Sequence, residues 1–368
     1  MWKTSITSAF SSVLRDTPPV SRTCAGRNTY QLLPSAQLFM ADLLHEIGRA
    51  RSSVGLQFYT FEDDSIGRPL ALALIAAHEQ GRKTRLMVDN YINLSINDHY
   101  IRVPRLDRKL QHSIREEWQA TLRLLEMMRN CGAGVKLIYP LGFLQHRALH
   151  RDHRKLAIID GRESEGIAYT GGFNPSEHNA SWNDFMVKMT GDMVPLLQDD
   201  LDRTWNGDHP GGITPYSEGL ILADAIGRSI ILPVVQHLIG LARRRVVIES
   251  AYLWGRGMIR ALMQVARDIE VDVIVPLHNN KKLFTPSERT LDRMGRAGVH
   301  VHRFRKHGGM THAKALLVDD VGIFGSNTFN GLLAGRMGEI VIATDNRSLV
   351  SQLEEFLSND MADSLRQS

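Results

Sequence analysis

The chain has 368 residues, of which 43% are hydrophobic and 23% charged, an ordinary globular composition that can bury a large core in two domains or one doubled domain. Lys and Arg number 44 against 40 Asp and Glu, a mildly basic balance that fits an anionic partner, lipid or nucleic acid, without choosing between them. The two cysteines, Cys24 and Cys131, exclude a disulfide framework and leave a reducing compartment as the default, and no apolar run is long enough to span a membrane.

Residues 1–29 form a tail that precedes the expected folded region. Apolar side chains recur there at roughly helical spacing from Trp2 to Leu14, and no acid occurs before Asp16. The tail lacks the compact apolar stretch of a secretory signal. An interfacial amphipathic segment, an organellar presequence and a frayed terminus all stay open. Two prolines then end any helix, so we expect the fold to begin near Tyr30.

From there on, one order of elements occurs twice along the chain. For the first half, residues 30–215, the apolar patterns predict a strand at 56–59, a helix at 69–79, and strands at 84–88 and 134–137. For the second half, residues 216–368, they predict a strand at 247–250, a helix at 258–267, and strands at 271–275 and 298–301. The repeated order predicts an α/β fold of two pseudo-symmetric halves, each with a mixed, largely parallel sheet flanked by helices.

A longer insertion, at 91–111, distinguishes the first half from the second. It is rich in Asn, Arg and Pro, and we expect it to form a loop and the start of a helix near the mouth of a site. Its basic residues are Arg102, Arg105, Arg108 and Lys109. They could contact anionic headgroups, and an ordinary solvated surface loop explains them equally well.

One short pattern, His-x-Lys-x-x-x-x-Asp, occurs once in each half. Its residues are His153, Lys155 and Asp160 in the first half and His312, Lys314 and Asp319 in the second. A His and a Lys two positions apart on an extended segment point to the same side, so both can face one phosphate. Two such segments brought together would supply a nucleophilic imidazole, a general acid and two ammonium groups around a single phosphorus.

A turn of small residues that ends in Asn follows each motif. The side-chain amides of Asn174 and Asn327, with the two motif lysines, are suited to hold the non-bridging oxygens of a phosphate. Gly172 and Ser326 would let the backbone approach that phosphate closely and could add donors. The aspartates that end the two motifs are expected to fix local structure rather than to touch substrate.

These residues resemble the phospholipase D superfamily, and most of all its bacterial cardiolipin synthases, over nearly all of residues 30–360. The likeness extends to the stretches 58–64 and 171–175, to Trp182-Asn183-Asp184 and to Tyr252. It implies two halves packed face to face around one active site, with no metal or other cofactor. It also implies transfer of a phosphatidyl group from a phospholipid to an alcohol, which in cardiolipin synthases is a glycerol hydroxyl of phosphatidylglycerol.

By the same resemblance, His153 is the nucleophile that forms a phosphohistidine and His312 is the general acid and base. The sequence itself does not break the symmetry between them. Each imidazole needs a carboxylate on its other ring nitrogen. The resemblance pairs Glu339 with His153 and Asp184 with His312, so that each pair crosses the halves.

Partners and location follow from the same likeness. The amino-terminal membrane helices of many cardiolipin synthases are absent from this sequence, so we expect peripheral contact with the cytoplasmic face of a membrane and a phospholipid substrate. The oligomeric state is left open.

Three alternatives were weighed against this hypothesis. A metal-independent nuclease shares the chemistry, but the basic clusters at 243–245 and 281–282 are short, so nucleic acid is a disfavoured partner. A non-catalytic lipid-binding module conflicts with two complete motifs. A metal site is not predicted, because no acidic or Cys ligand set accompanies His146 and His150, or His302 and His307.

Overall fold

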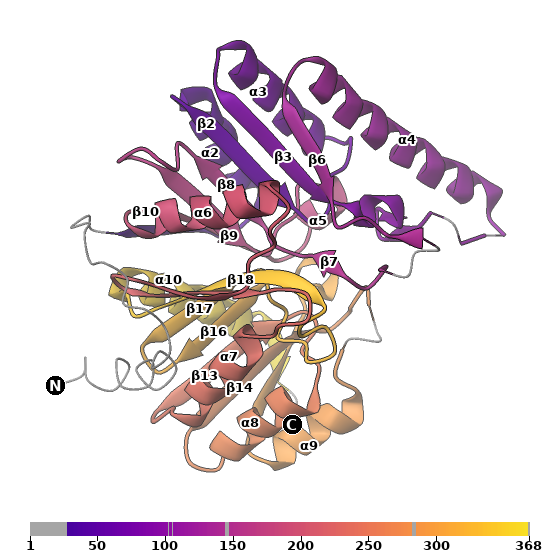
Figure 1. Cartoon of the computed structure of the whole chain (residues 1–368). Coiled ribbons are helices and arrows are strands. Elements are labelled where there is room, and N and C mark those ends of the chain that lie inside the picture. The colour runs from indigo at the N-terminus through magenta and orange to yellow at the C-terminus, as the bar shows by residue number, and fades with distance from the viewer. Residues whose placement is uncertain (1–27, 102, 105, 144–146, 282–284, 367–368) are drawn as a thin grey trace.

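The computed structural model describes residues 28–366, apart from 102, 105, 144–146 and 282–284. The predicted tail at 1–29 therefore lies almost wholly outside the described residues, as do Arg102, Arg105, His146 and Lys282. The rest of the chain forms two large sheets, with helices between them and on their outer faces (Figure 1).

Seven strands form the first sheet, in the order β1-β10-β9-β8-β2-β3-β6. Their bounds are β1 (Thr29–Leu33), β2 (Ser53–Phe58), β3 (Lys83–Asp89), β6 (Gly134–Ile138), β8 (Leu156–Ile159), β9 (Ile167–Gly171) and β10 (Met186–Thr190). One face packs on helices α2 (Ala36–Arg49), α3 (Gly67–Glu79) and α4 (Arg108–Asn130), and the other packs on α6 (Met193–Trp205). Between β3 and α4 lie a short 3-10 helix, η1 (Asn90–Asn93), and a hairpin of β4 (Ser95–Ile96) and β5 (His99–Tyr100), while α5 (Glu177–Ala180) follows β9.

The second sheet has the order β11-β12-β18-β17-β16-β13-β14-β15-β19, and the short strand β7 pairs with β18. The bounds are β7 (Arg151–Asp152), β11 (Gly212–Tyr216), β12 (Gly219–Asp224), β13 (Arg245–Ser250), β14 (Glu270–Pro276), β15 (His300–Phe304), β16 (Lys314–Val318), β17 (Val321–Gly325), β18 (Met337–Thr344) and β19 (Ser364–Arg366). Helices α7 (Ile231–Gly240), α8 (Arg256–Val265) and α9 (Glu288–Arg296) pack on the outer face. Helix α10 (Arg347–Ala362) packs on the inner face, and η4 (His307–Gly309) precedes β16.

The α/β class is confirmed, and the expected strands and helices lie within a few residues of their predicted positions. The expectation of largely parallel sheets is wrong. In the first sheet only β2–β3 and β3–β6 are parallel, and the other four pairings are antiparallel. The reason is connection length: α3 and α4 carry the chain between the parallel strands, whereas short turns join β8 to β9 and β16 to β17.

Both sheets share one pairing pattern around their centres. Strand β2 lies between parallel β3 and antiparallel β8, as β13 lies between parallel β14 and antiparallel β16. This agreement fits the duplicated order of elements, but the duplication itself and the boundaries 30–215 and 216–368 stay predictions.

Local sequence signals explain where the helices begin. Ser35 caps α2, its hydroxyl accepting the N–H of Leu38, and Phe39, Leu43 and Ile47 then place one buried side chain per turn against the sheet. Among the described residues, none of the helices combines the length and the apolar content that crossing a bilayer requires.

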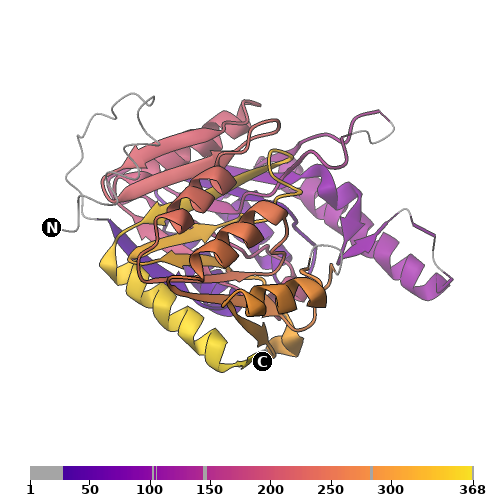
Figure 2. The same cartoon turned by 90° about the horizontal axis from the view of Figure 1, so that it is seen from below.

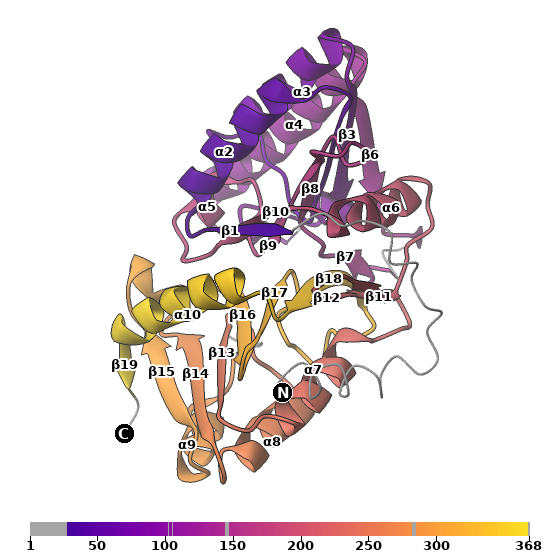
Figure 3. The same cartoon turned by 90° about the vertical axis from the view of Figure 1, so that its left-hand side faces the viewer.

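Helices α6 and α10 lie in the layer between the two sheets (Figure 3), and their buried side chains belong to one apolar cluster drawn from both halves. Helix α6 contributes Leu197, α10 contributes Leu353 and Phe356, and the two sheets close the layer from either side. At its edge, the side chain of Gln352 accepts the N–H of Leu32 at 2.8 Å and donates to the carbonyl of Tyr30. The halves therefore share a core, which holds the segments that carry the two motifs at fixed positions.

Candidate active site

Strand β7 brings the two motifs together, because it belongs to the first half of the sequence but pairs with β18 of the second. Directly after β7, the N–H of His153 donates to the carbonyl of Gly338 at 2.7 Å. On the other side, the N–H of His312 donates to the carbonyl of Asn183, also at 2.7 Å. The main chain of each motif histidine is thus bonded to the residue that precedes a carboxylate of the opposite half.

Those carboxylates bind the imidazoles. Nδ1 of His153 lies 3.0 Å and 3.2 Å from the two carboxylate oxygens of Glu339, and Nδ1 of His312 lies 2.7 Å from Oδ2 of Asp184. All four side chains are buried. A hydrogen on Nδ1 that is donated to a carboxylate leaves the lone pair on Nε2, the form needed for attack or proton transfer. The two contacts join the same residues that the family resemblance paired.

Burial controls the protonation of the site. It lowers the pKa of His153, and the neighbouring Lys155 ammonium adds to the effect. Burial also lowers the pKa of His312 well below its usual range, and the positive charge of Lys314 lowers it further. For Asp184, burial raises the pKa to about 6 against the opposing charge of Lys314. Both imidazoles are therefore neutral near neutral pH, as a nucleophile requires.

The two motif lysines lie beside the imidazoles and are fully buried. Nζ of Lys155 donates to the main-chain carbonyl of His153 at 2.7 Å. Nζ of Lys314 donates to the carbonyl of His312 and lies 2.9 Å from its Nδ1. Burial lowers the pKa of Lys155 to about 7 and that of Lys314 to about 8. An anion bound beside them would favour the ammonium form again, because opposite charges offset the cost of burial.

The two asparagines are held by their side-chain oxygens. Oδ1 of Asn174 accepts the N–H of Thr60 at 3.4 Å, and Oδ1 of Asn327 accepts the N–H of Phe329 at 2.7 Å. These contacts fix each amide plane and leave its NH₂ group to donate. The geometry is compatible with the predicted contact to phosphate oxygens.

Gly172 and Ser326 need a correction, because their donors are already occupied. The N–H of Gly172 donates to the carbonyl of Phe185 at 3.2 Å. The N–H of Ser326 donates to the carbonyl of Ile340 at 2.9 Å, and its hydroxyl donates to Glu339. These contacts leave no donor of Gly172 or Ser326 for a phosphate, and the expected close approach of the backbone at these residues stays a prediction. They serve the carboxylates instead: Ser326 holds Glu339, and Gly172 leaves space for Asp184.

The aspartates that end the motifs hold turns at the opposite ends of β8 and β16 from the imidazoles. The carboxylate of Asp160 accepts the N–H groups of Ser52 and Ser53 at 2.7 Å and 2.9 Å, just before β2. Asp319 does the same before β13, accepting the N–H groups of Arg244 and Arg245 at 2.8 Å and 3.1 Å. These contacts agree with a local structural role, and we assign neither residue to the chemistry.

Aromatic rings surround the imidazoles. The ring centroid of Tyr59 lies 4.8 Å from that of His153, and those of Trp182 and Tyr252 lie 5.2 Å and 5.8 Å from that of His312. All three belong to the stretches on which the resemblance was drawn, but no role was predicted for them. Their position directly after β2 and β13, or beside Asp184, was the available signal.

A bridge between the halves was not predicted at all. Asp98 lies in the turn between β4 and β5. Its carboxylate accepts a hydrogen bond from the side-chain amide of Asn280 at 2.8 Å and forms an ion pair with Nζ of Lys281 at 3.2 Å. Asn280 in turn accepts the hydroxyl of Tyr252 at 2.8 Å. Lys281, one of the basic residues of the cluster at 281–282, is partly buried where it forms this ion pair. Asn97 and Asp98 both have positive φ, as in a two-residue hairpin loop, and Asn and Asp are residue types that adopt this conformation readily.

A second buried network supports the segment around His312. Glu249 of β13 is fully buried and accepts the hydroxyl of Thr311, while Asn183 donates to Asp360 at 2.6 Å. Burial raises the pKa of Glu249 well above its usual range, and the nearby charge of Asp360 adds to it. A protonated Glu249 can remain inside the fold and hold Thr311, the residue that precedes His312.

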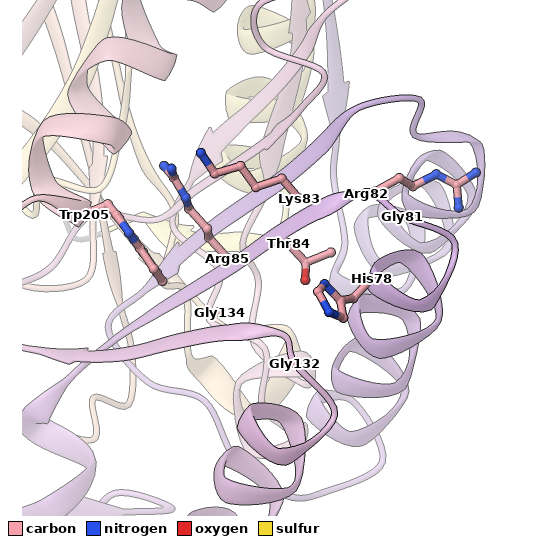
Figure 4. Close-up of a pocket in the computed structure, with 9 residues that line it drawn as sticks. All are labelled: His78, Gly81, Arg82, Lys83, Thr84, Arg85, Gly132, Gly134 and Trp205. Carbon is pink, nitrogen blue, oxygen red and sulfur yellow. The ribbon is translucent and has the colours of Figure 1, made fainter.

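Two other features lie away from the imidazoles. An open pocket at the far end of β3 and β6 is lined by His78, Gly81, Arg82, Lys83, Thr84, Arg85, Gly132, Gly134 and Trp205 (Figure 4). Within the described ranges, one group of carboxylates and an imidazole is close enough to share a cation: Glu270 and Asp272 on β14 with His300 on β15. Asp272 also forms a hydrogen bond with Nε2 of His302 at 2.7 Å.

Comparisons with known proteins show similarity to cardiolipin synthases. The chain is 25% identical to cardiolipin synthase A of Pseudomonas putida (strain GB-1) over 374 residues, covering 95% of this chain and 72% of that protein. It is likewise 25% identical to cardiolipin synthase A of Pseudomonas entomophila (strain L48) over 375 residues, with the same coverage.

Among solved structures, phosphatidylserine synthase of Haemophilus influenzae has a TM-score of 0.65 at 13% identity, covering 92% of this chain and 87% of that one. Polyphosphate kinase of Porphyromonas gingivalis has a TM-score of 0.63 at 17% identity, covering 96% and 50%. At these identities the likeness shows a shared fold. The model of the family described as "Cardiolipin synthase, PLD-like domain" matches residues 43–205 and 235–361. The resemblance drawn from the sequence is thus confirmed, and the chain belongs to this family.

Proposed function

We propose that the protein is a phospholipase D-type phosphatidyltransferase that uses a covalent phosphohistidine, with phosphatidylglycerol as donor and acceptor in a cardiolipin synthase-like reaction. The single observation that carries the proposal is the pair of buried imidazoles from opposite halves, each bound at Nδ1 by a carboxylate of the other half. The relatives named cardiolipin synthase A support the choice of a phospholipid substrate.

Binding comes first in this mechanism. A phosphodiester carries a negative charge that repels nucleophiles, so its non-bridging oxygens must be held by cations and donors. Lys155 and Lys314 supply the charge, and the NH₂ groups of Asn174 and Asn327 supply neutral donors. The bound anion also raises the pKa of His312 from its low value, because it offsets the two ammonium charges, and so prepares this imidazole to carry a proton.

In the first chemical step, Nε2 of His153 attacks phosphorus, and the bond from phosphorus to the headgroup oxygen breaks. His312 gives its proton to that oxygen, so glycerol leaves when the donor is phosphatidylglycerol. The carboxylate of Glu339 stabilises the charge that develops on the His153 ring. The product is a phosphatidyl group joined to the imidazole.

In the second step, His312 accepts the proton of an incoming hydroxyl, and the hydroxyl oxygen attacks phosphorus. The phosphorus–nitrogen bond breaks and His153 returns to its neutral form. A glycerol hydroxyl of a second phosphatidylglycerol yields cardiolipin, whereas water yields phosphatidic acid. We also propose that the enzyme works bound peripherally to the cytoplasmic face of a membrane, because both lipids reside in a bilayer.

The test is to incubate the purified protein with phosphatidylglycerol and follow cardiolipin and glycerol, with His153→Ala as the control. Each assay is run with and without a chelator, and full inhibition by the chelator would contradict the metal-free scheme. No turnover of any common phospholipid, with or without added alcohol, sinks the proposal. Metal-independent cleavage of DNA that is lost in His153→Ala would support the nuclease alternative instead.

A further inference from the structure

Large apolar side chains are exposed in two short segments of the first half. Of the ten that are exposed in the described part of the chain, five fall at 100–106 and 143–149. They are Tyr100, Val103, Leu106, Phe143 and Leu149. Leu106 is fully exposed, and Phe143 and Leu149 are 83% and 60% exposed. A soluble protein rarely gathers apolar side chains in this way unless the surface has a partner.

Both segments border the candidate active site. Leu149 lies four residues before His153, and the intervening chain forms β7. Tyr100 ends β5, and Nζ of Lys281 lies 5.7 Å from its ring centroid. Lys281 belongs to the bridge that reaches Tyr252 and hence the His312 ring. In Figure 1 the amino-terminal end of α4 projects at the right of the molecule, on the side where β7 also lies, and Figure 2 shows this end of α4 at the right as well.

Cations accompany the apolar side chains. Arg108 and Lys109, at the start of α4, are exposed next to Leu106, and Arg147 is exposed next to Leu149. The acid among them, Asp107, caps α4 by accepting the N–H of Lys109 at 3.0 Å. Apolar side chains flanked by Lys and Arg are what the headgroup region of an anionic bilayer accommodates, since the chains enter the acyl boundary and the cations stay at the phosphates.

We propose that these five side chains form a docking surface that inserts into a bilayer containing anionic phospholipid. The inference rests on the proposed function and names the partner that brings substrate to the site. Extracting a phospholipid into water would expose both acyl chains. A site held at the headgroup plane can reach the phosphodiester while those chains remain in the membrane.

The experiment compares two matched variants of the full chain. One carries Val103→Ser, Leu106→Ser and Leu149→Ser. The control carries Leu38→Ser and Leu72→Ser, which are 53% and 50% exposed on α2 and α3. We measure sedimentation with vesicles made of equal parts of phosphatidylcholine and phosphatidylglycerol, and hydrolysis of the water-soluble bis-p-nitrophenyl phosphate.

We expect the docking-surface variant to lose at least about ten-fold in vesicle binding, while the control and the soluble hydrolysis stay near wild type. Retained hydrolysis also shows that the variant is folded. Wild type that does not bind vesicles, or a control that loses as much binding as the variant, overturns the inference. A variant that binds vesicles normally but elutes at a smaller mass than wild type overturns it too, because the surface would then join two copies of the chain.

A second measurement does not depend on loss of binding. Leu106→Trp should show a blue shift and increased intensity of its emission when vesicles are added, read as a difference against Leu38→Trp. Equal spectra for the two variants overturn the insertion. If wild type binds vesicles and Leu106→Trp shifts while no phosphodiester is turned over, the docking surface stands and the proposed function fails.

Discussion

His153 and Glu339 stand 186 residues apart in the sequence, yet Nδ1 of the first lies 3.0 Å from Oε1 of the second. The pairing of β7 with β18 creates this contact. In the counterpart contact, His312 of the second half binds Asp184 of the first half. Neither motif imidazole therefore has its carboxylate partner in its own half of the chain. The proposed mechanism therefore requires both halves of the chain to be folded against each other.

Glu339→Gln should lower turnover of phosphatidylglycerol by about 10²–10⁴-fold, because an amide cannot stabilise the imidazolium and can turn the ring to the wrong tautomer. The steady-state rate of cardiolipin formation measures this. Glu354→Gln is the matched control, since Glu354 is a partly exposed acid on α10 that pairs with Arg245. A Glu339→Gln enzyme within about ten-fold of wild type would remove Glu339 from the mechanism.

The two histidines should differ in a trapping experiment. With phosphatidylglycerol labelled in the phosphate, acid-free denaturation during turnover should leave label on the peptide that contains His153 and none on the peptide that contains His312. His153→Ala should abolish the label, and either His→Ala change should lower turnover by several orders of magnitude. Label found on His312 would reverse the two roles while keeping the reaction.

Substrate binding should weaken as pH rises. Burial holds the pKa of Lys155 at about 7 and that of Lys314 at about 8, so both ammonium groups lose their protons across this range and attract an anion less. We expect KM for bis-p-nitrophenyl phosphate to increase between about pH 6 and about pH 9. In Lys155→Arg the guanidinium stays charged, so the lower step should disappear. A KM that is flat over this range in wild type would contradict the prediction.

Lys155→Met should inactivate the enzyme and stabilise the fold. The pKa of Lys155 is lowered on folding, so the unfolded chain binds the proton more readily and stability is reduced at pH values below the ordinary lysine pKa. Removing the buried charge should raise the free energy of unfolding by about 1–4 kcal/mol at neutral pH, and by less in alkali.

Thermal melts of Lys155→Met at neutral and alkaline pH test this, with Lys188→Met as the control. Lys188 pairs with Asp42 and Glu46 at 3.0 Å and 2.8 Å, so its replacement should leave stability unchanged or reduce it. A Lys155→Met protein that melts below wild type at neutral pH would show that the lysine contributes to folding rather than opposing it.

Gly172→Ala should impair catalysis without removing any functional group. An added Cβ would come within 2.2 Å of Oδ1 of Asp184, so the carboxylate must move away from His312. A displacement of about 1 Å at such a site can cost about 10²-fold in rate. Gly212→Ala, where a Cβ would meet nothing within 4 Å, is the control. Equal activity in both variants would show that Asp184 can relocate freely.

The local features of this protein could be predicted from short stretches of its sequence. Each motif has its His and Lys within three residues, and the spacing of apolar side chains indicates each strand or helix. The motifs and the elements could therefore be recognised without coordinates. The family followed from these short stretches, because their residue types are what phosphodiester chemistry requires. The partners of Asp160 and Asp319 lie in the turns that begin the neighbouring strands, which agrees with the local structural role expected for them.

Which hydrogen-bond donors remain for a substrate depends instead on how the strands and loops pack. Gly172 and Ser326 looked available in the sequence, but the carbonyls of Phe185 and Ile340 on adjacent strands take their N–H groups. The bridge from Asp98 to Asn280 spans 182 positions, and no local pattern encodes it. Hydrogen-bond partners depend on strand pairing and on which loops the packed halves bring together. These are properties of the whole chain, whereas a motif is a property of a few neighbouring residues.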